Sequence, residues 1–417
     1  MLDNHPLRER VVQEMLLRRF PAIEAPARIV QIVRIVDSGE SAAELDHALA
    51  MPHVVRIDDQ RGERHIAGVS SDGATMLWER HSEASTATCL LPEGLSTSAY
   101  IGWIEAMPGK VVRAIQIDIA VNEASARPAI ERAQPGDDDL VTCHIGPCRL
   151  WSDFRMGGDG YGHIVIAANG CPPADLGRIV QRLQELGNYR NLALLGLPMA
   201  QEHGPRLDRL ETELAGLASS IAEGGREDEA LLDALSDLSS ELAHISAHTA
   251  FRMSATQAYA AIVADRLAQL DTATINGHQS LVDFNDRRLM PAIRTCSNFG
   301  DRLERLDSRA ARVTALLRTR IETRIERQNR DLLASVERGI GLQLRLQHLV
   351  ESLSVLAISY YAVGLIADLA RGAAAGIGGF SAEVVTAVAV VPVTLSIAIF
   401  IARRRHGLFA RDGEPAA

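Results

Sequence analysis

Positive charge is scarce in this sequence. Its 417 residues include 53 acidic and 43 basic side chains, which gives a formal net charge of −10. Nucleic-acid-binding domains usually carry a basic patch and a high isoelectric point, so the composition argues against a nucleic-acid partner. Lys110 is the single lysine, and all the other basic residues are arginines. We interpret this bias as the drift of an alanine- and arginine-rich genome, so arginine counts carry little functional weight.

Cysteine is also sparse. The sequence has five cysteines, an odd number and few for its length, which argues against a disulfide framework and indicates a reducing compartment. Residues 1–25 contain no uninterrupted apolar stretch of seven or more residues after a basic start, so we expect no secretory signal peptide. The soluble part of the chain should then stay in the cytosol.

Motifs of catalysis and nucleotide binding are missing. The sequence has no H-E-x-x-H, G-x-S-x-G, Walker or dinucleotide fingerprint. A metal-ligand cluster within residues 143–171 fits no standard zinc spacing, so we interpret its cysteines as small buried hydrophobes. The cluster comprises Cys143, His144, Cys148, His163 and Cys171. The glycine-rich run 157–162 lacks the lysine of a phosphate loop and favours a hairpin turn. We expect no enzyme activity, no cofactor and no metal.

The N-terminal part of the chain has short β-like segments. After an amphipathic helix expected over residues 5–20, which Pro21 and Pro26 end, apolar and β-branched runs predict strands. The expected strands are 29–36, 53–57, 75–79, 86–91, 111–121, 141–145 and 163–168. Helices are expected near 42–49, 96–107 and 124–132. The pattern predicts a mixed α/β domain.

Beyond Pro172 the sequence is helical almost to residue 350. Apolar residues recur at spacings of three and four, which puts one seam on each helix of a bundle or coiled coil. The seams are Leu207, Leu210, Leu214, Leu217 and Ile221; Leu235, Leu238, Leu242, Ile245 and Thr249; and Leu303, Leu306, Ala310, Val313 and Leu317. Gly224, Gly225 and Gly277 are expected breaks.

The stretch 301–350 has no proline and would extend roughly 70 Å as one helix. Its apolar stripe continues beyond Leu317 through Ile321, Ile325, Leu332, Val336 and Ile340 with spacings that drift toward four. A helix whose apolar stripe drifts around its axis can pack on other helices of its own chain. A helix that packs on symmetric copies of itself needs an apolar seam that persists along its length. We therefore predict that this stripe packs within one chain.

Two apolar runs lie near the C-terminus. Residues 384–402 carry no charge, and a run of this length can cross a hydrocarbon core of about 30 Å. Residues 352–367 form a shorter run that extends through Leu349 and Val350. A buried core helix is the alternative for the first run, but the pair, separated by the glycine-rich stretch 372–379, favours a transmembrane hairpin.

The basic residues that flank these runs predict their orientation. Arg345 and His348 precede the first run and Arg403 to Arg405 follow the second, whereas the connecting loop offers only Arg371. Positive residues favour the cytoplasmic side, so both termini should be cytoplasmic. This predicts a multi-pass protein of the inner (cytoplasmic) membrane.

Several blocks across the chain are similar to a bacterial family of uncharacterised membrane-anchored proteins, domain-of-unknown-function family 3422. The blocks are His5-Pro6-Leu7-Arg8, residues 78–83, 151–155, 177–183, 189–190, 192–198, 351–354 and Tyr360-Tyr361. The resemblance implies membrane anchoring and no particular activity. The chain departs from the family at Ser82-Glu83-Ala84, where Thr-Glu-Phe is usual, and at Gly187-Asn188, where an acidic, helix-favouring pair is usual.

A looser likeness is to the CorA type of divalent-cation channel, which also combines a cytosolic α/β domain, a long helix and two C-terminal spans. That family carries Gly-Met-Asn at the outer end of its first span, where this chain reads Ala362-Val363-Gly364-Leu365-Ile366. The likeness is one of architecture only.

Two polar segments are candidates for a binding site. On a strand, Glu79, His81 and Glu83 share one face, which could hold a metal or move a proton, or could be a solvated face. If the segments around residues 78 and 151 pair, their side chains could form a pocket for a small polar ligand; the alternative is an ion pair capped by two tryptophans. The candidate pocket residues are Trp78, Arg80, Trp151, Asp153 and Arg155.

The sequence thus predicts an α+β protein. Its expected parts are a cytosolic α/β domain (1–171), a helical bundle and stalk (172–348), a transmembrane hairpin (349–402) and a short cytosolic tail (403–417). The expected function is non-enzymatic: a membrane-anchored module that binds a ligand or partner in the cytosol, with the lipid bilayer as one partner and a homo-oligomer as another. The alternative is a CorA-like oligomeric ion channel or transporter.

Overall fold

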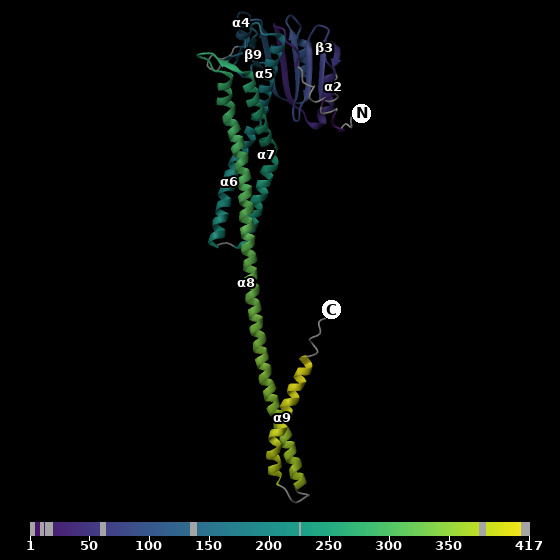
Figure 1. Ribbon diagram of the computed structural model, residues 1–417, viewed down its shortest axis with the longest axis vertical. Helices are drawn as coiled ribbons and strands as arrows, with labels where there is room; N and C mark the ends of the chain where they lie inside the picture. The colour runs from purple at the N-terminus through teal and green to yellow at the C-terminus, as the bar shows by residue number, and fades with distance from the viewer. Residues whose placement is uncertain are drawn as a thin grey trace. The chain divides into compact units, whose positions relative to one another are not determined.

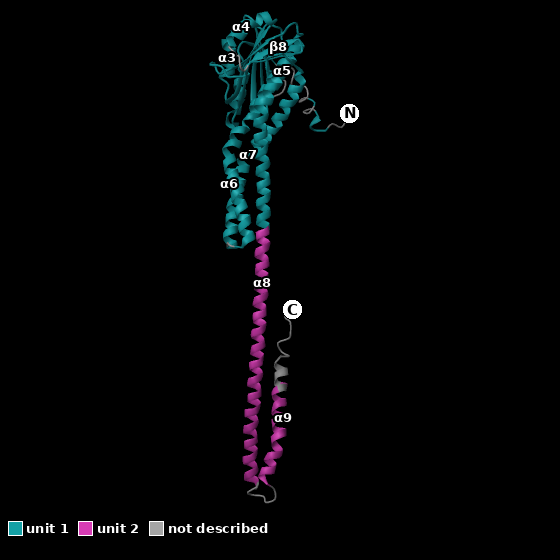
Figure 2. Ribbon diagram, turned by 90° about the vertical axis from the view of Figure 1, so that its left-hand side faces the viewer, with its two compact units in different colours: residues 1–315 teal, residues 316–417 magenta. Residues whose placement is uncertain are grey.

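The computed structural model describes residues 5–8, 12, 20–58, 64–133, 140–224, 227–374 and 381–409. The chain divides into two units, residues 1–315 and residues 316–417 (Figure 2). Most of the helix expected over residues 5–20 lies outside the described residues, as do residues 375–380 of the glycine-rich stretch.

A sheet of ten strands forms the core of the first unit. The strands are β1 (Ala27–Ile35), β2 (Val54–Asp58), β3 (His65–Ser70), β4 (Thr75–Arg80), β5 (Ser85–Pro92), β6 (Lys110–Ala120), β7 (Val141–Ile145), β8 (Cys148–Ser152), β9 (Gly162–Ala167) and β10 (Thr272–Thr274). Their order in the sheet is β10-β7-β8-β9-β6-β1-β5-β4-β3-β2. Only the β6–β9 pair is parallel among these described strands. All seven strands expected from sequence are present, and β3, β8 and β10 are additional.

The helices of the first unit cover both faces of the sheet. They are η1 (Ser38–Glu40), α2 (Ser41–Leu49), α3 (Ser98–Glu105), α4 (Glu123–Ala133), α5 (Pro173–Leu194), α6 (Gly196–Glu223), α7 (Asp228–Leu270) and the start of α8 (Leu281–Ala374). Strand β1 is buried on both sides because residues such as Ile29 pack under α5 while Val30 and Ile32 pack under α3. This explains its unbroken apolar run. The mixed α/β domain is therefore confirmed.

Three long helices, α6, α7 and α8, run side by side in the first unit (Figure 1). Most residues of the expected seams are buried, with Leu210, Leu238 and Leu306 each almost wholly inaccessible. Ile221 and Val313 are half-buried. Arg302 of α8 binds Asp208 and Glu211 of α6, with Nη2 at 2.6 and 2.8 Å from their carboxylate oxygens. Gly224, at φ 74°, ends α6 in the left-handed conformation that glycine adopts freely. The predicted helical region and this break are confirmed.

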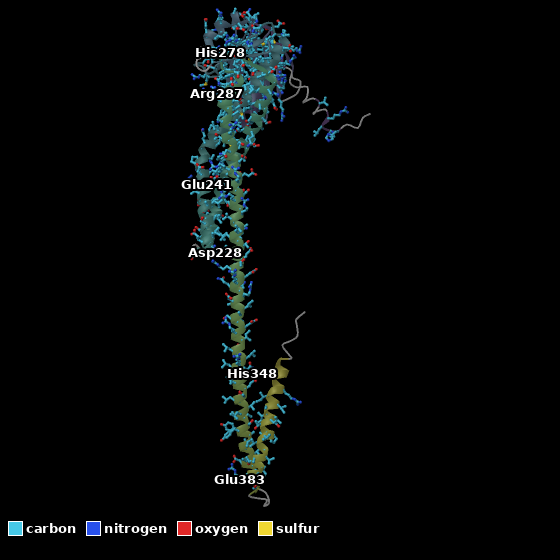
Figure 3. All side chains as sticks on the ribbon, turned by 60° about the vertical axis from the view of Figure 1, so that its left-hand side comes forward. Asp228, Glu241, His278, Arg287, His348 and Glu383 are labelled. Atoms are coloured by element: carbon cyan, nitrogen blue, oxygen red, sulfur yellow. The ribbon has the colours of Figure 1, made fainter. Side chains whose placement is uncertain are left out.

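The apolar stripe of α8 behaves differently after Leu317. Leu317 is buried, but Ile325, Leu332, Val336 and Ile340 are each at least half exposed in the part of the chain that the structure describes. The prediction that this stripe packs within one chain is wrong beyond Leu317. Figure 3 shows the side chains of this part of α8 radiating from a single helix.

The second unit ends with α9 (Ala382–Phe409), which lies beside the last turns of α8 (Figure 2). Both α8 and α9 are long and apolar enough to cross a membrane, over parts of Leu281–Ala373 and over Ala382–Ile401. None of the apolar stretch of α9 is buried within the chain. The alternative of a buried core helix is therefore wrong for α9.

Candidate functional site

The two segments of the expected pocket do not meet. Trp78 and Arg80 belong to β4, which pairs with β3 and β5, whereas Trp151 belongs to β8, which pairs with β7 and β9. Strands β9, β6, β1 and β5 separate the two. The single pocket expected from Trp78, Arg80, Trp151, Asp153 and Arg155 is a wrong prediction, because long-range strand order is not encoded in the local pattern.

Trp78 and Arg80 hold a helix on the sheet. The Trp78 indole Nε1 donates a hydrogen bond to Glu44 Oε1 of α2 at 3.0 Å, and Arg80 Nη2 donates to Glu44 Oε2 at 2.7 Å. Trp78 and Glu44 are fully buried, and the Arg80 guanidinium lies 5.0 Å from the indole centroid. A buried carboxylate needs such partners. This arrangement is structural: an ion pair of Arg80 and Glu44 beside one tryptophan. The alternative interpretation, an ion pair capped by two tryptophans, is correct only for the ion pair and Trp78, because Trp151 lies on the distant strand β8.

Trp151 also packs in a core, whereas its two neighbours do not. The indole is buried in a small cluster with α4, under the Arg149 guanidinium at 4.8 Å. Asp153 and Arg155 lie at the edge of an open hollow of about 660 Å³, whose charged groups include the Arg28–Asp118 pair at 2.7 Å. Asp153 Oδ1 accepts the Arg155 backbone N–H at 3.0 Å.

Glu79, His81 and Glu83 do not form one site, because Glu79 and Glu83 have separate partners. Glu79 lies 3.6 Å from His65 Nε2 and 3.9 Å from His81 Nε2, while Glu83 accepts a hydrogen bond from Arg252 of α7 at 2.9 Å. No group of three His, Cys, Asp or Glu side chains in the described residues could hold a metal ion. Cys143 and Cys148 are buried, as expected of small hydrophobes.

The structure builds a different cavity, between the sheet and helices α5 and α7. Its volume is about 370 Å³, within the range of small-molecule sites. The strands contribute Gln31, Val33, His65, Leu77, Glu79, Thr86 and Thr88, and the helices contribute Gln181, Gln184, Asn188, Tyr189, Leu192, Tyr259 and Ile262. We call it the sheet–α5 cavity. Of the five expected pocket residues, only Arg80 lines it.

Gln31 and Thr88 of the sheet, together with Asn188 of α5, form what we call the polar floor of this cavity. Strand register explains the position of the first two. Gln31 of β1 lies opposite Thr88 of β5, and Thr88 lies opposite Leu77 of β4. Side chains alternate between the two faces of a sheet, so Gln31 and Thr88 share the face under α5. Gln31 Nε2 donates a hydrogen bond to Thr88 Oγ1 at 3.0 Å. A polar pair in the centre of a covered sheet is unusual and marks the site.

A buried arginine supports this floor. Arg113 of β6 donates through Nη1 to Gln31 Oε1 at 3.2 Å and to Asn188 Oδ1 at 2.8 Å. Burial, together with repulsion from Arg190, lowers the pKa of Arg113 to about 9, so the side chain is still a cation at neutral pH. Among the described residues no carboxylate lies within ion-pair distance of Arg113. Buried charges are usually paired, which makes this cation exceptional.

A second buried arginine lies on α5. The Arg190 guanidinium lies over Phe154 and Phe284, at 4.6 and 5.2 Å from the ring centroids. Burial lowers its pKa to about 10. The described residues offer Arg190 aromatic faces and no carboxylate, so positive charge accumulates on this side of the sheet.

Two tyrosines close part of the cavity. The rings of Tyr189 on α5 and Tyr259 on α7 stack with centroids 5.6 Å apart. Burial and the neighbouring Glu83 raise the pKa of Tyr259, so its hydroxyl stays protonated at neutral pH. The lining therefore combines aromatic faces, amides and hydroxyl groups, an arrangement suited to binding.

Sequence reasoning missed this site for identifiable reasons. Arginine counts carried little weight, and neither Arg113 nor Arg190 was a candidate residue, although both are buried. The available signals were Gln31, Thr86 and Thr88 within otherwise apolar strands, and the departure from the family at Gly187-Asn188, because both of these residues contact Arg113.

The fold and the cavity define an α+β protein with a polar pocket between a mixed sheet and its covering helices. Comparison with protein families goes one step further: residues 3–408 match the family described as "Protein of unknown function (DUF3422)". The chain belongs to this family, as its sequence blocks indicated. No curated protein and no solved structure matches the chain, so the likeness to CorA-type channels has no support from these comparisons.

Proposed function

We propose that the chain is a non-enzymatic, membrane-anchored binding protein whose sheet–α5 cavity takes a small ligand in the cytosol. The observation that carries this proposal is the polar floor of the cavity, where Arg113 holds Gln31 and Asn188 beneath a space of about 370 Å³. A protein that needed only stability at this position would gain by an apolar contact, because buried polar groups are costly.

The exposed apolar surface of the second unit supports the anchor. Val388 and Val391 on α9, and Leu356 and Leu365 near the end of α8, are all more than 60% exposed. Apolar surface of this extent is costly in water, and a bilayer covers it. The arginines at 403–405 favour an arrangement with both termini in the cytoplasm of the inner membrane.

The state of two buried thiols disfavours one kind of catalysis, that by a cysteine nucleophile. Burial and the neighbouring Cys171 raise the pKa of Cys148 to about 12, and burial also raises the pKa of Cys143. Thiols in this state are poor nucleophiles at neutral pH because the thiolate is the reactive form.

Self-association belongs to the same proposal. The stripe of Ile325, Leu332, Val336 and Ile340 on α8 is exposed within the described chain. Helices that enter one membrane in the same direction can cover such stripes on each other. A channel would need a higher-order ring around a central pore, whereas a binding protein needs at most a dimer.

Membrane association and orientation are tested together. After carbonate extraction the full-length protein should remain with the membrane fraction. A reporter that is active only outside the cytosol should give signal when inserted at Gly376 and none when fused after Ala417. Signal from the C-terminal fusion would overturn the orientation, and recovery in the soluble fraction would overturn the anchor.

The size of the protein in detergent separates the binding protein from the channel. For the binding protein we expect a monomer or dimer by light scattering. With two spans per chain, neither of these states has enough helices to surround a central pore. A pentamer would favour the channel.

A further inference from the structure

We infer that the ligand of the sheet–α5 cavity is a small organic carboxylate, bound through a floor of hydrogen-bond donors that Arg113 orients. This inference rests on the proposed binding function and adds the chemical class of the ligand. It follows from three features of the cavity: the orientation of its amides, the balance of its charges and the nature of its walls.

Arg113 decides which way two amides face. A guanidinium only donates hydrogen bonds, so the side-chain oxygens of Gln31 and Asn188 must turn toward it. Their NH₂ groups therefore turn away from the arginine. The Gln31 NH₂ group donates to Thr88 Oγ1 at 3.0 Å.

The floor that results is rich in donors. Because Thr88 accepts the bond from Gln31, its own hydroxyl hydrogen is available, and Thr88 donates to no other group in the described chain. In the same part of the chain the Asn188 NH₂ group has no hydrogen-bond partner. Gln184 Nε2 is buried and also unpaired. All three residues line the cavity, but the Gln184 Nε2 atom itself has almost no accessible surface. The donors that a ligand must satisfy with acceptor atoms are therefore those of Thr88 and Asn188.

The charges point to an anion. Of the acidic groups at the cavity, Glu185 pairs with Arg266, and Glu79 lies 3.6 Å from His65 Nε2 and 3.9 Å from His81 Nε2, contacts that are ionic where a histidine is protonated. Arg64 and Arg80 also line the cavity. Arg113 and Arg190 have no carboxylate partner among the described residues. An anionic oxygen acceptor would meet the donors and offset the buried positive charge.

The walls indicate an organic body. Val33, Leu77, Leu192 and Ile262 line the cavity together with Phe20. An inorganic anion would leave these side chains facing water-sized gaps, whereas an apolar or aromatic body would pack against them. A carboxylate on a compact hydrocarbon frame fits both the floor and the walls.

Three compounds of nearly equal shape test the class of ligand. Benzoate, benzamide and benzylamine are titrated into the purified full-length protein at constant ionic strength, with binding followed by ligand-observed NMR. We expect benzoate to bind most tightly, benzamide more weakly and benzylamine not measurably. Binding of benzylamine or benzamide in preference to benzoate would overturn this inference while leaving the cavity a binding site. No binding of any of the three would also overturn it.

The variant Asn188→Asp tests the role of Arg113. It places a carboxylate beside the guanidinium, so the protein should fold with an unchanged or higher melting temperature while benzoate affinity falls on the order of tenfold or more. Asn329→Asp makes the same change of charge at an exposed position of the second unit and should leave benzoate binding unchanged. Equal benzoate affinity in wild type and a folded Asn188→Asp variant would overturn the inference.

Benzamide binding to Asn188→Asp completes the comparison. Benzamide carries no charge, so its affinity should fall less than that of benzoate. An equal loss for both compounds would show that the variant only distorts the cavity, and the assignment of an anionic ligand would then be wrong. Membrane association, measured by carbonate extraction, does not depend on either result.

Discussion

Arg113 Nη1 donates a hydrogen bond to Asn188 Oδ1 at 2.8 Å, and this contact joins the central strand β6 to helix α5. Gly187, the preceding residue, makes the contact possible. A Cβ atom at Gly187 would lie 2.5 Å from Arg113 Nη2 and 2.6 Å from its Cζ. Because Gly187 has no side chain, the Arg113 guanidinium has room to lie beside Asn188.

The first prediction concerns Gly187→Ala. The new methyl group must displace a guanidinium that is buried and held by two hydrogen bonds, so overpacking should cost about 1–3 kcal/mol. Alanine regains up to about 1 kcal/mol of helix propensity, and the free energy of unfolding should still fall. Chemical denaturation measures the change.

Gly216→Ala in α6 is the matched control. A Cβ at Gly216 meets nothing within 4 Å, so this change should stabilise the protein by up to about 1 kcal/mol. Stabilisation by both substitutions would show that Arg113 moves aside freely.

The second prediction concerns the buried carboxylate of Glu44. Glu44→Ala removes the partner of both Trp78 and Arg80, so it should lower the free energy of unfolding by about 3–5 kcal/mol. Glu123→Ala removes a partner of Arg149 at a side chain that is 44% exposed, and should cost about 1 kcal/mol or less. Equal effects in denaturant titrations would contradict the structural role assigned to Glu44.

Local periodicity explains why so much of the helical region could be predicted. The seams of α6, α7 and α8 follow from spacings of three and four, which any helix converts into one face. Leu210, Leu238 and Leu306 are buried for this reason. The strands could also be found individually, because runs such as β1 are rich in β-branched residues.

The binding site could not be predicted in the same way, because it depends on which strands are neighbours. Trp78 and Trp151 lie in similar sequence contexts, yet four strands separate them. Conversely, Arg113 and Asn188 are 75 residues apart in sequence and share a hydrogen bond. The exposure of α8 beyond Leu317 was missed because a sequence stripe does not show where its neighbouring helices end.

The third prediction uses two leucines of α8. Leu306 is almost fully buried, so Leu306→Asp loses its transfer free energy and buries a charge, and should cost several kcal/mol, in the range of about 3–5 kcal/mol. Leu316 is 67% exposed, and Leu316→Asp should change stability by about 0.5 kcal/mol or less. Thermal unfolding followed by circular dichroism should separate them, and similar melting temperatures would show that the seam of α8 is not packed.

The fourth prediction concerns acid stability. Hydrogen bonds from Ser70 and Tyr100 lower the pKa of Asp72 below its ordinary value of 3.8. For a carboxyl group whose pKa is lowered by folding, the stabilisation is present above the unfolded value and is lost as the pH falls through the folded value. The wild type should therefore lose stability more steeply than Asp72→Asn below about pH 4.

Tyr100→Phe provides an intermediate case for the same measurement. It removes the hydroxyl that donates to Asp72 Oδ1 at 2.5 Å and leaves the bond from Ser70. Its loss of stability with falling pH should lie between those of the wild type and Asp72→Asn. Identical pH profiles for the three proteins would show that Asp72 contributes nothing through its charge.

The fifth prediction concerns the exposed stripe of α8. Replacing Ile325 and Leu332 together by Asp should not unfold the first unit, because both side chains are at least half exposed in the described chain. If copies of the chain cover this stripe on each other, the double variant should shift light-scattering mass in detergent from dimer toward monomer, since apolar burial drives such packing. Thr323→Asp and Asn329→Asp together add the same charges at exposed polar positions of the same helix, and this control should keep the wild-type mass. A monomeric wild type, or an equal shift in both double variants, would show that the stripe does not mediate self-association.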